Sequence, residues 1–398
     1  MDEMPRTVKD LLVEIKDTTE LMVDLAYSAI LFDNEDIAEE VLDLEEKTEE
    51  LIRQLRVVSI LAGRRVEEAE MVSSILQIAS AAQKIGEAAG DIATLVLRGF
   101  KLPREMVNEI LLESEVTLVR AEVAEDSEIV GKTLGEVRLH TRTGMRVIAI
   151  KRGFDWIFDP DRDTKILRND VLFARGDITG VQEFFRIVSN KEVKMESTEI
   201  KDKKLEKSVD ILIEIKDLSE LSVDLGYSSI IYYNEDIAQE VYYLEEKIDN
   251  LKIELVKWVL QAGKNVSDDE SYKVLMSLID IAYSSEIIAD AAKEMAGIVI
   301  KKLEIHPVFR SAMMESDEIL TVIEVSEMCE LDGKTLGEAR VETNTGMHVI
   351  AIKRGNRWIT KPKATTRVQA GDLLFAKGTR EGEKLLRKMC TIARKPLA

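Results

Sequence analysis

Apolar residues recur at two different spacings along the chain. Between Val8 and about Arg98 they return every three or four positions, which predicts three helices with breaks near Asn34 and Gly63. Asn34 is an effective N-cap, and the two acidic residues that follow it suit the positive end of a helix dipole. Three helices of this length joined by short connections predict an antiparallel bundle.

From about Val116 the apolar period falls to two. The segments TLVRAEVA, MRVIAIKRG, DWIF and VLFARG predict short strands separated by turns, with a short helix over 131–137. A closing helix that carries Phe184 and Phe185 is expected to cover one face of the sheet. This part of the chain therefore predicts a small α+β domain. The basic pairs that end its longest strand are interpreted as solvated in both copies of the module: Lys151-Arg152 and Lys353-Arg354.

Both modules occur twice, which makes the chain a tandem duplication. The helical segment DLAYSAILFDNEDIAEEVLDLEEK at 24–47 returns as DLGYSSIIYYNEDIAQEVYYLEEK at 224–247, and GKTLGEVRLHTRTGMRVIAIKRG at 131–153 returns as GKTLGEARVETNTGMHVIAIKRG at 333–355. A repeat of this length determines the architecture. We expect an α+β multidomain protein in which two antiparallel helical bundles alternate with two small α+β domains. The expected boundaries are 1–112 (helical), 113–190 (α+β), 191–208 (charged linker), 209–312 (helical) and 313–398 (α+β).

Charge and composition exclude several classes of function. The net charge of −20 argues against nucleic acid as a partner, because phosphate binding requires clustered basic residues. The sequence contains no recognisable catalytic motif and only three His, so we expect that it is not an enzyme. Cys329 and Cys390 do not form a disulfide framework or zinc motif. We also expect a chain that is neither secreted nor membrane-spanning.

Four sequence elements recur in both α+β modules. The first copy has GKTLGE, TGMRVIAIKRG, Pro160 and NDVLFARG, and the second has GKTLGE, TGMHVIAIKRG, Pro362 and AGDLLFAKG. In this combination they resemble the TrkA-C (RCK C-terminal) family, a regulatory domain of potassium-transport proteins. The resemblance implies ligand-sensing domains that pair, within the chain or as a homodimer, at the cytosolic face of a membrane cation channel or transporter. It also implies a small ligand such as cyclic di-AMP, whereas NAD is not expected because no GxGxxG follows a strand.

In that family the ligand contacts lie on the strand after TGM and on the segment before it. The corresponding residues are His140 and Arg146 in the first copy and Glu342 and His348 in the second. Glu342 would repel a phosphate, which argues against cyclic di-AMP on at least one side of the interface. His348 is either a proton sensor, with an ordinary pKa of about 6.5, or an inert surface residue.

The helical modules carry NEDIAEEVLDLEEK and its copy and, on the third helix, QKIGE at 83–87, which corresponds to EIIAD at 286–290. These segments resemble PhoU, a regulator of phosphate uptake whose third helix can ligate metal. The resemblance implies a divalent or ferric metal ion. Acidic residues at i,i+4 spacing present oxygen ligands to a hard cation, or they form a solvated acidic stripe. The candidates are Glu87, Asp91, Glu286 and Asp290.

Asp24 and Asp224 interrupt the apolar face of the first helix in each module. Each is flanked by Leu and Val and has a Glu one turn earlier. Burial of a carboxylate without a partner is costly, so a buried position requires a hydrogen-bond donor, a basic side chain or an ion. The alternative is an exposed acidic stripe that continues through Asp10 and Asp17.

The leading hypothesis is a cytoplasmic regulator at the inner face of the membrane. It would sense a small ligand or ion and control cation transport, above all of potassium. Two alternatives stay open: a metal-binding, PhoU-like regulator of phosphate transport, and a regulator of divalent-cation transport of the magnesium type. Duplication lets one chain build the paired interface internally, after which the two sides are able to diverge.

Overall fold

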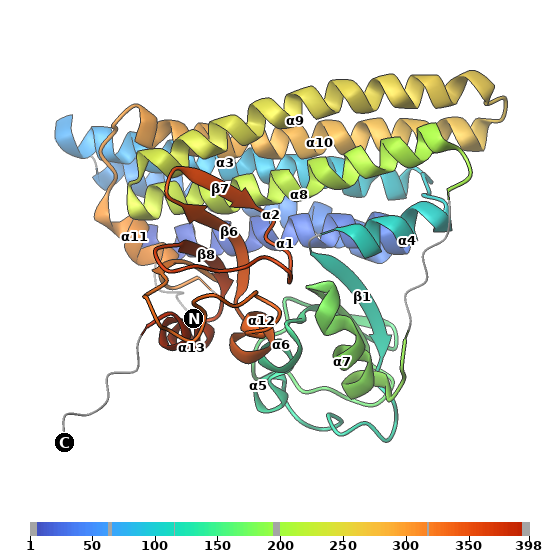
Figure 1. The fold of residues 1–398 in the computed structure, drawn as a ribbon. Coiled ribbons are helices and arrows are strands. Elements are labelled where there is room, and N and C mark those ends of the chain that lie inside the picture. Colours follow the sequence, from blue (N-terminus) through green and yellow to red (C-terminus); the bar gives the residue numbers. More distant parts are fainter. Residues whose placement is uncertain (1–5, 63–65, 115, 194–199, 317, 392–398) are drawn as a thin grey trace, which may run out of the picture. The chain divides into compact units, whose positions relative to one another are not determined.

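The chain divides into two compact units in the computed structural model (Figure 1). One unit consists of Met1–Ser114 and Glu196–Ser316, and the other of Glu115–Met195 and Asp317–Ala398. Each unit therefore combines the corresponding modules of both copies. The predicted break at Gly63 lies outside the described residues. The structure describes residues 6–62, 66–114, 116–193, 200–316 and 318–391.

The helical unit consists mainly of long helices. In the first copy they are α1 Val8–Phe32, α2 Glu35–Ala62, α3 Val66–Leu97 and α4 Arg104–Glu113. In the second copy they are α8 Lys203–Tyr232, α9 Glu235–Ala262, the 3-10 turn η1 Gly263–Asn265, α10 Asp269–Ile300 and α11 Pro307–Met313. The Asn34 side chain accepts a hydrogen bond of 3.1 Å from the backbone N–H of Ile37, which confirms the predicted cap of α2.

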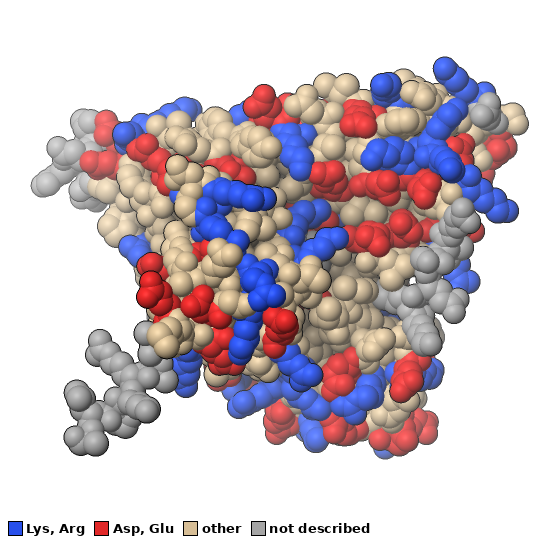
Figure 2. All heavy atoms as spheres, viewed as in Figure 1, with Lys and Arg blue, Asp and Glu red and all other residues tan. Residues whose placement is uncertain are grey.

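The two three-helix bundles pack on each other through α3 and α10. Both helices turn small residues towards the buried interior, among them Ala89 and Ala93 on α3 and Ala292 and Ala296 on α10. Small side chains let two helix axes approach closely. The described helices include none that is long and apolar enough to cross a membrane. Figure 2 shows acidic and basic side chains interspersed over the viewed surface.

Each half of the second unit is a four-stranded antiparallel sheet with short helices. The first half has β1 Thr117–Glu122, α5 Leu134–Val137, α6 Leu139–Thr143, β2 Arg146–Arg152, β3 Asp155–Phe158, β4 Val171–Gly176 and α7 Ile178–Ser189. The second half has β5 Ile319–Glu324, α12 Val341–Thr345, β6 His348–Arg354, β7 Arg357–Thr360, β8 Leu373–Gly378 and α13 Arg380–Cys390. The strand orders are β1-β4-β2-β3 and β5-β8-β6-β7. Phe184 of α7 is fully buried against the first sheet and Phe185 is partly buried, which confirms the predicted closing helix.

The GKTLGE segment forms a capped turn. Thr133 Oγ1 accepts a bond of 3.2 Å from the backbone N–H of Glu136, whose carboxylate accepts a bond of 2.9 Å from the Thr133 N–H. This reciprocal capping box starts α5. Gly135 has no space for a side chain, because a Cβ would lie 2.9 Å from the carbonyl oxygen of Arg162. The helix predicted over 131–137 is shorter in the structure, where it is the single turn Leu134–Val137.

The interpretation of the strand ends as solvated is wrong for both arginines. Arg152 donates two bonds of 2.9 Å to Asp170, and Arg354 donates bonds of 2.8 and 2.7 Å to Asp372. Asp170 and Asp372 are only 1% and 0% exposed. A buried carboxylate requires such a bidentate partner. The sequence pattern does not reveal the pairs, because each partner lies 18 residues further along the chain.

The linker predicted over 191–208 extends too far, because its last residues belong to helix α8. α8 begins at Lys203, and the Asp202 side chain caps it by accepting a bond of 2.8 Å from the backbone N–H of Lys204. Lys and Glu favour helix formation as well as solvation, so the charge pattern alone did not locate the end of the linker. Residues 194–199 of the predicted linker lie outside the described residues.

The two sheet modules pack on each other within the chain through α6 and α12. Each of these helices ends at a glycine with a left-handed backbone, Gly144 at φ +73° and Gly346 at φ +67°. A Cβ at Gly144 would lie 3.0 Å from Cγ of Glu342 in the other copy, and one at Gly346 would lie 3.3 Å from the Cα of Thr141. The glycine of the TGM motif therefore permits the close approach of the two copies.

Replacing Asp372 by Asn should destabilise the sheet unit, because Arg354 then loses its buried anion. We expect the free energy of unfolding to fall by roughly 3 kcal/mol. Urea unfolding followed by tryptophan fluorescence in a Trp258→Phe background would measure this, since the remaining tryptophans lie on β3 and β7. The exposed Glu324→Gln change is the control. Equal unfolding midpoints for Asp372→Asn and its parent would contradict the role of the ion pair.

Candidate functional site

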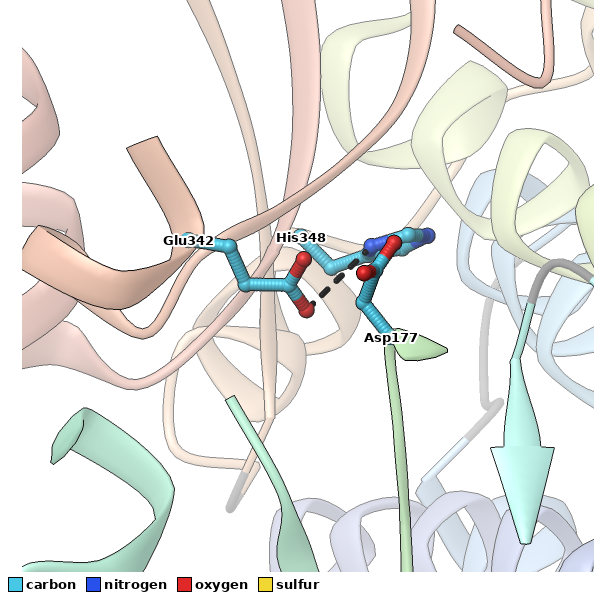
Figure 3. A group of neighbouring side chains, drawn as sticks. All are labelled: Asp177, Glu342 and His348. Carbon is cyan, nitrogen blue, oxygen red and sulfur yellow. Dashed lines mark ion pairs between the residues drawn. The ribbon is translucent and has the colours of Figure 1, made fainter. Parts of the chain in front are cut away.

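Three ionisable side chains meet where the two sheet modules pack together (Figure 3). Asp177 belongs to the first copy and caps α7, whereas Glu342 lies in α12 and His348 begins β6 of the second copy. Each side chain offers one ligand atom, and these atoms all lie within 4.8 Å of one another. His348 Nδ1 is 3.5 Å from Glu342 Oε1. The structure thus brings two of the predicted ligand residues together and adds Asp177, which sequence reasoning missed.

The same three side chains line a cavity of about 170 Å³. Its walls include Thr179 from the first copy and Arg340, Met347 and Pro362 from the second. The volume corresponds to several water molecules, since one occupies about 30 Å³ in the liquid. A hydrated ion or a small polar ligand therefore fits the cavity.

The two carboxylates of the cavity favour a positively charged ligand, whereas Arg340 in its wall opposes one. Burial raises the pKa of Glu342, and the imidazole of His348 opposes this rise through its charge and a hydrogen bond. The negative charge of Asp177 raises the pKa of Glu342 further. A cation or proton placed between the two carboxylates would relieve their repulsion, whereas a phosphate would add to it.

The corresponding residues of the first copy, His140 and Arg146, lie in a different environment. Arg146 is 3.3 Å from the buried carboxylate of Glu318, which also binds Arg175 and lies 3.9 Å from Lys377. Burial opposes the ionisation of Glu318, but these positive charges outweigh it and hold its pKa well below the usual range. Burial lowers the pKa of His140 to about 4, so this imidazole is neutral at neutral pH. A phosphate ligand would have to compete with Glu318 for Arg146.

In the second helical module, two lysines pair with acids of the cluster that contains the predicted metal ligands Glu286 and Asp290. Lys252 Nζ is 2.8 Å from the carboxylate of Glu286, and Lys293 Nζ is 2.7 Å from that of Glu245. Burial raises the pKa of Glu245 and the neighbouring Asp290 adds to the rise, so Asp290 belongs to the same cluster. The two lysines supply the positive charge that a metal ion would otherwise provide.

The first helical module lacks these lysines and has Ile52 and Gly90 at the corresponding positions. Glu45 lies over Gly90, where no side chain separates it from α3. Burial raises the pKa of Glu45 to about 7, and the charges of Asp91 and of neighbouring glutamates including Glu87 add to the rise. In the ranges that the structure describes, these acids do not bring three ligand atoms together as the Asp177 cluster does. The predicted ligands Glu87 and Asp91 therefore lie in a cluster of like charge.

Asp24 and Asp224 lie on the first helix of each module, and the structure shows how far each is exposed to solvent. Asp224 is buried, Asp24 is half-buried and Asp10 is exposed. The exposed-stripe interpretation therefore holds at Asp10, but not at Asp17 and Asp24, which are half-buried, nor at Asp224. Buried lysines also lie on these two helices.

Lys16 and Lys216 are buried between the two bundles, and sequence reasoning missed both. Each pairs with the glutamate one turn later at 2.9 Å. Lys216 Nζ lies 5.1 Å from the ring centre of Tyr27, and Lys16 Nζ lies 5.8 Å from that of Tyr227. The available signal was a lysine within an otherwise apolar helix face in each copy, at VEIKD and IEIKD.

Replacing Glu45 by Gln should stabilise the helical unit at pH 8. With a pKa of about 7 in place of 4.5, folded Glu45 binds more protons than the unfolded chain in this range, so stability falls as the pH rises from 4.5 to 7. Glu45→Gln cannot ionise, so above pH 7 it should be more stable to unfolding than the wild-type chain. Below pH 5 the two chains should be equally stable. After allowance for solvent screening, we expect the free energy of unfolding at pH 8 to rise by about 1 kcal/mol. This corresponds to roughly 2–4 °C in unfolding temperature. Circular dichroism melts at both pH values would measure it.

The matched control is Glu245→Gln, because Glu245 occupies the corresponding position but pairs with Lys293. This change should lower the unfolding temperature at pH 8, since it leaves Lys293 without its anion. Shifts of the same sign for both variants would be incompatible with the difference between the two helical halves.

Comparison with known proteins identifies both modules. The TrkA-C domain family matches residues 118–189 and 320–391, and the PhoU domain family matches residues 12–96 and 212–299. Over 98 residues the chain is 32% identical to Potassium channel protein 1 of Methanocaldococcus jannaschii. This alignment covers 23% of the chain and 29% of that relative, so the chain spans less than a third of the relative's length.

Solved structures with partial likeness have low sequence identity. PhoU from Pseudomonas aeruginosa has a TM-score of 0.38 and 13% identity, and the match covers 74% of this chain and 93% of that one. The GsuK RCK domain has a TM-score of 0.18 and 12% identity, with 81% and 78% covered. The human SLO3 gating ring has a TM-score of 0.24 and 12% identity, with 74% of each chain covered. On the domain matches, the chain is a protein of two PhoU domains and two TrkA-C domains arranged in tandem.

Proposed function

We propose that this chain regulates cation transport, above all of potassium, and that its paired TrkA-C domains bind the controlling ligand or ion. The cavity bounded by Asp177, Glu342 and His348 is the observation that supports this most, because it lies where the two TrkA-C domains of one chain pack together. The similarity to Potassium channel protein 1 favours potassium over other cations.

Regulation would act on a separate membrane channel or transporter whose cytosolic face the chain contacts. A ligand shifts a conformational equilibrium only if it binds one state more tightly than the other. A site shared by α12 and the start of α7 meets this condition, because the distance between its groups depends on how the two domains pack. We assign the chain to the cytoplasm and to a binding rather than a catalytic role.

A metal-binding regulator of phosphate transport is the second candidate. The PhoU matches favour it, and the like-charged cluster around Glu45 is a place where a cation would be stabilising. Lys252 and Lys293 argue against a second metal cluster in the other half. A regulator of magnesium-type transport has less support from the cavity, because Mg²⁺ prefers oxygen ligands to the imidazole of His348.

Uptake of ions by cells of the source organism, with and without the gene for this chain, would test the proposal. We expect deletion to change the uptake of ⁸⁶Rb⁺, a tracer for potassium, by about fivefold or more, which is the low end of ordinary allosteric coupling. Uptake of phosphate and of Mg²⁺ should stay unchanged. The wild-type chain should restore the rate, and a Glu342→Gln/His348→Gln chain should not.

An unchanged ⁸⁶Rb⁺ rate together with altered phosphate uptake would contradict the proposal and support the second candidate. Glu324→Gln is a suitable control for expression and folding, because it changes an exposed carboxylate in the same unit. That control chain should restore ⁸⁶Rb⁺ uptake as well as the wild-type chain does.

A further inference from the structure

We propose that Asp177, Glu342 and His348 bind one divalent transition-metal ion of the Zn²⁺ class. The ion would bridge the two TrkA-C domains, since Asp177 comes from the first copy and the other two ligands come from the second (Figure 3). The inference deepens the proposed function and rests on it for its regulatory meaning. The binding itself follows from the side chains of the cavity.

The ligand atoms are already close to the spacing that a metal ion requires. One nitrogen and one oxygen from each carboxylate lie within 4.8 Å of one another, and His348 Nδ1 is 3.5 Å from Glu342 Oε1. Ligands bound tetrahedrally at about 2.0–2.2 Å from Zn²⁺ stand roughly 3–4 Å apart. Small side-chain rotations would therefore complete the site without movement of the backbone.

Regular elements hold each of the three ligands. One carboxylate oxygen of Asp177 accepts a bond of 2.7 Å from the backbone N–H of Thr179, which fixes the side chain at the start of α7. Glu342 lies in the first turn of α12 and packs against Gly144, where no side chain crowds it. His348 is the first residue of β6 and is paired with β8. Ligands on helix ends and strands are positioned more accurately than ligands on loops.

The chemistry of the ligands selects the class of ion. An imidazole nitrogen suits Zn²⁺, Cu²⁺, Fe²⁺ and Ni²⁺, whereas Mg²⁺, Ca²⁺ and Mn²⁺ prefer oxygen ligands. Two carboxylates balance the charge of a divalent ion. The cavity of about 170 Å³ has room for water molecules that would complete the coordination. The site therefore fits a divalent metal with three protein ligands and water.

The other side of the domain pair does not offer an equivalent site. The corresponding positions there are His140, Arg146 and Thr379. A guanidinium does not ligate metal, and Arg146 contacts Glu318 at 3.3 Å. The expected stoichiometry is therefore one ion per chain, which distinguishes this site from any pair of sites in the two helical halves.

Native mass spectrometry and calorimetric titration of the full chain with Zn²⁺, Mn²⁺ and Mg²⁺ would test the proposal. We expect one Zn²⁺ per chain, weaker Mn²⁺ and no stoichiometric Mg²⁺. His348→Gln should weaken Zn²⁺ binding by at least about tenfold and change the visible absorption of bound Co²⁺, because a nitrogen ligand is lost. Zn²⁺ should also raise the unfolding temperature of the wild-type chain but not of this variant, which separates lost binding from lost folding.

Three control variants locate the binding. His140→Gln and His306→Gln each remove an imidazole elsewhere, and Glu87→Gln/Asp91→Asn removes carboxylates of the helical unit, so all three should bind Zn²⁺ like the wild-type chain. Absence of one-to-one Zn²⁺ binding, or unchanged affinity in His348→Gln, would overturn the metal site. Loss of binding only in the helical variant would overturn it too.

The two proposals fail in different experiments. Zn²⁺ binding at this site with normal ⁸⁶Rb⁺ uptake in the Glu342→Gln/His348→Gln chain would contradict the proposed function alone. Altered ⁸⁶Rb⁺ uptake in that chain, with no Zn²⁺ bound by the wild-type protein, would contradict the metal site alone.

Discussion

The close approach of α6 and α12 is the constraint on which the candidate site depends. Both helices end at glycines whose left-handed backbone disfavours any side chain, and a Cβ at Gly144 would lie 3.0 Å from Glu342. Because the two TrkA-C domains approach so closely, Asp177 of one copy reaches Glu342 and His348 of the other. The set of three ligands is therefore complete only while the two domains are paired, which couples occupancy of the site to the packing of the pair.

Tandem duplication lets the two sides of such a pair carry different chemistry. A homodimer would present identical residues on both sides, whereas this chain has Glu342 and His348 opposite His140 and Arg146. One side gathers carboxylates and an imidazole, and the other neutralises Arg146 with the buried Glu318. The helical unit diverges in the same way. Lysines compensate the acids of its second half, and the first half lacks them.

Much of the fold could be predicted from the sequence because it depends on local spacing. The helices, the strands and the Asn34 cap follow from periodicity and capping preferences that act within a few residues. Arg152 was misinterpreted because its partner, Asp170, reaches it only through the pairing of strands. Asp177 was missed for a similar reason, since the groups around it belong to the other copy. The apolar helix face around Lys16 was a local signal, but the burial of this lysine depends on the packing of two bundles, which the local pattern does not reveal.

The candidate site requires that one chain forms the TrkA-C pair by itself, because its ligands come from both copies. The most direct test is the distance between spin labels at Arg142→Cys and Asn344→Cys, two exposed positions on α6 and α12, in a Cys329→Ala/Cys390→Ala background. Double electron–electron resonance should give one short distance whose signal is unaffected when a large excess of unlabelled chain is present. Loss of that signal on dilution would show that the domains pair between chains, so that one chain does not form the pair by itself.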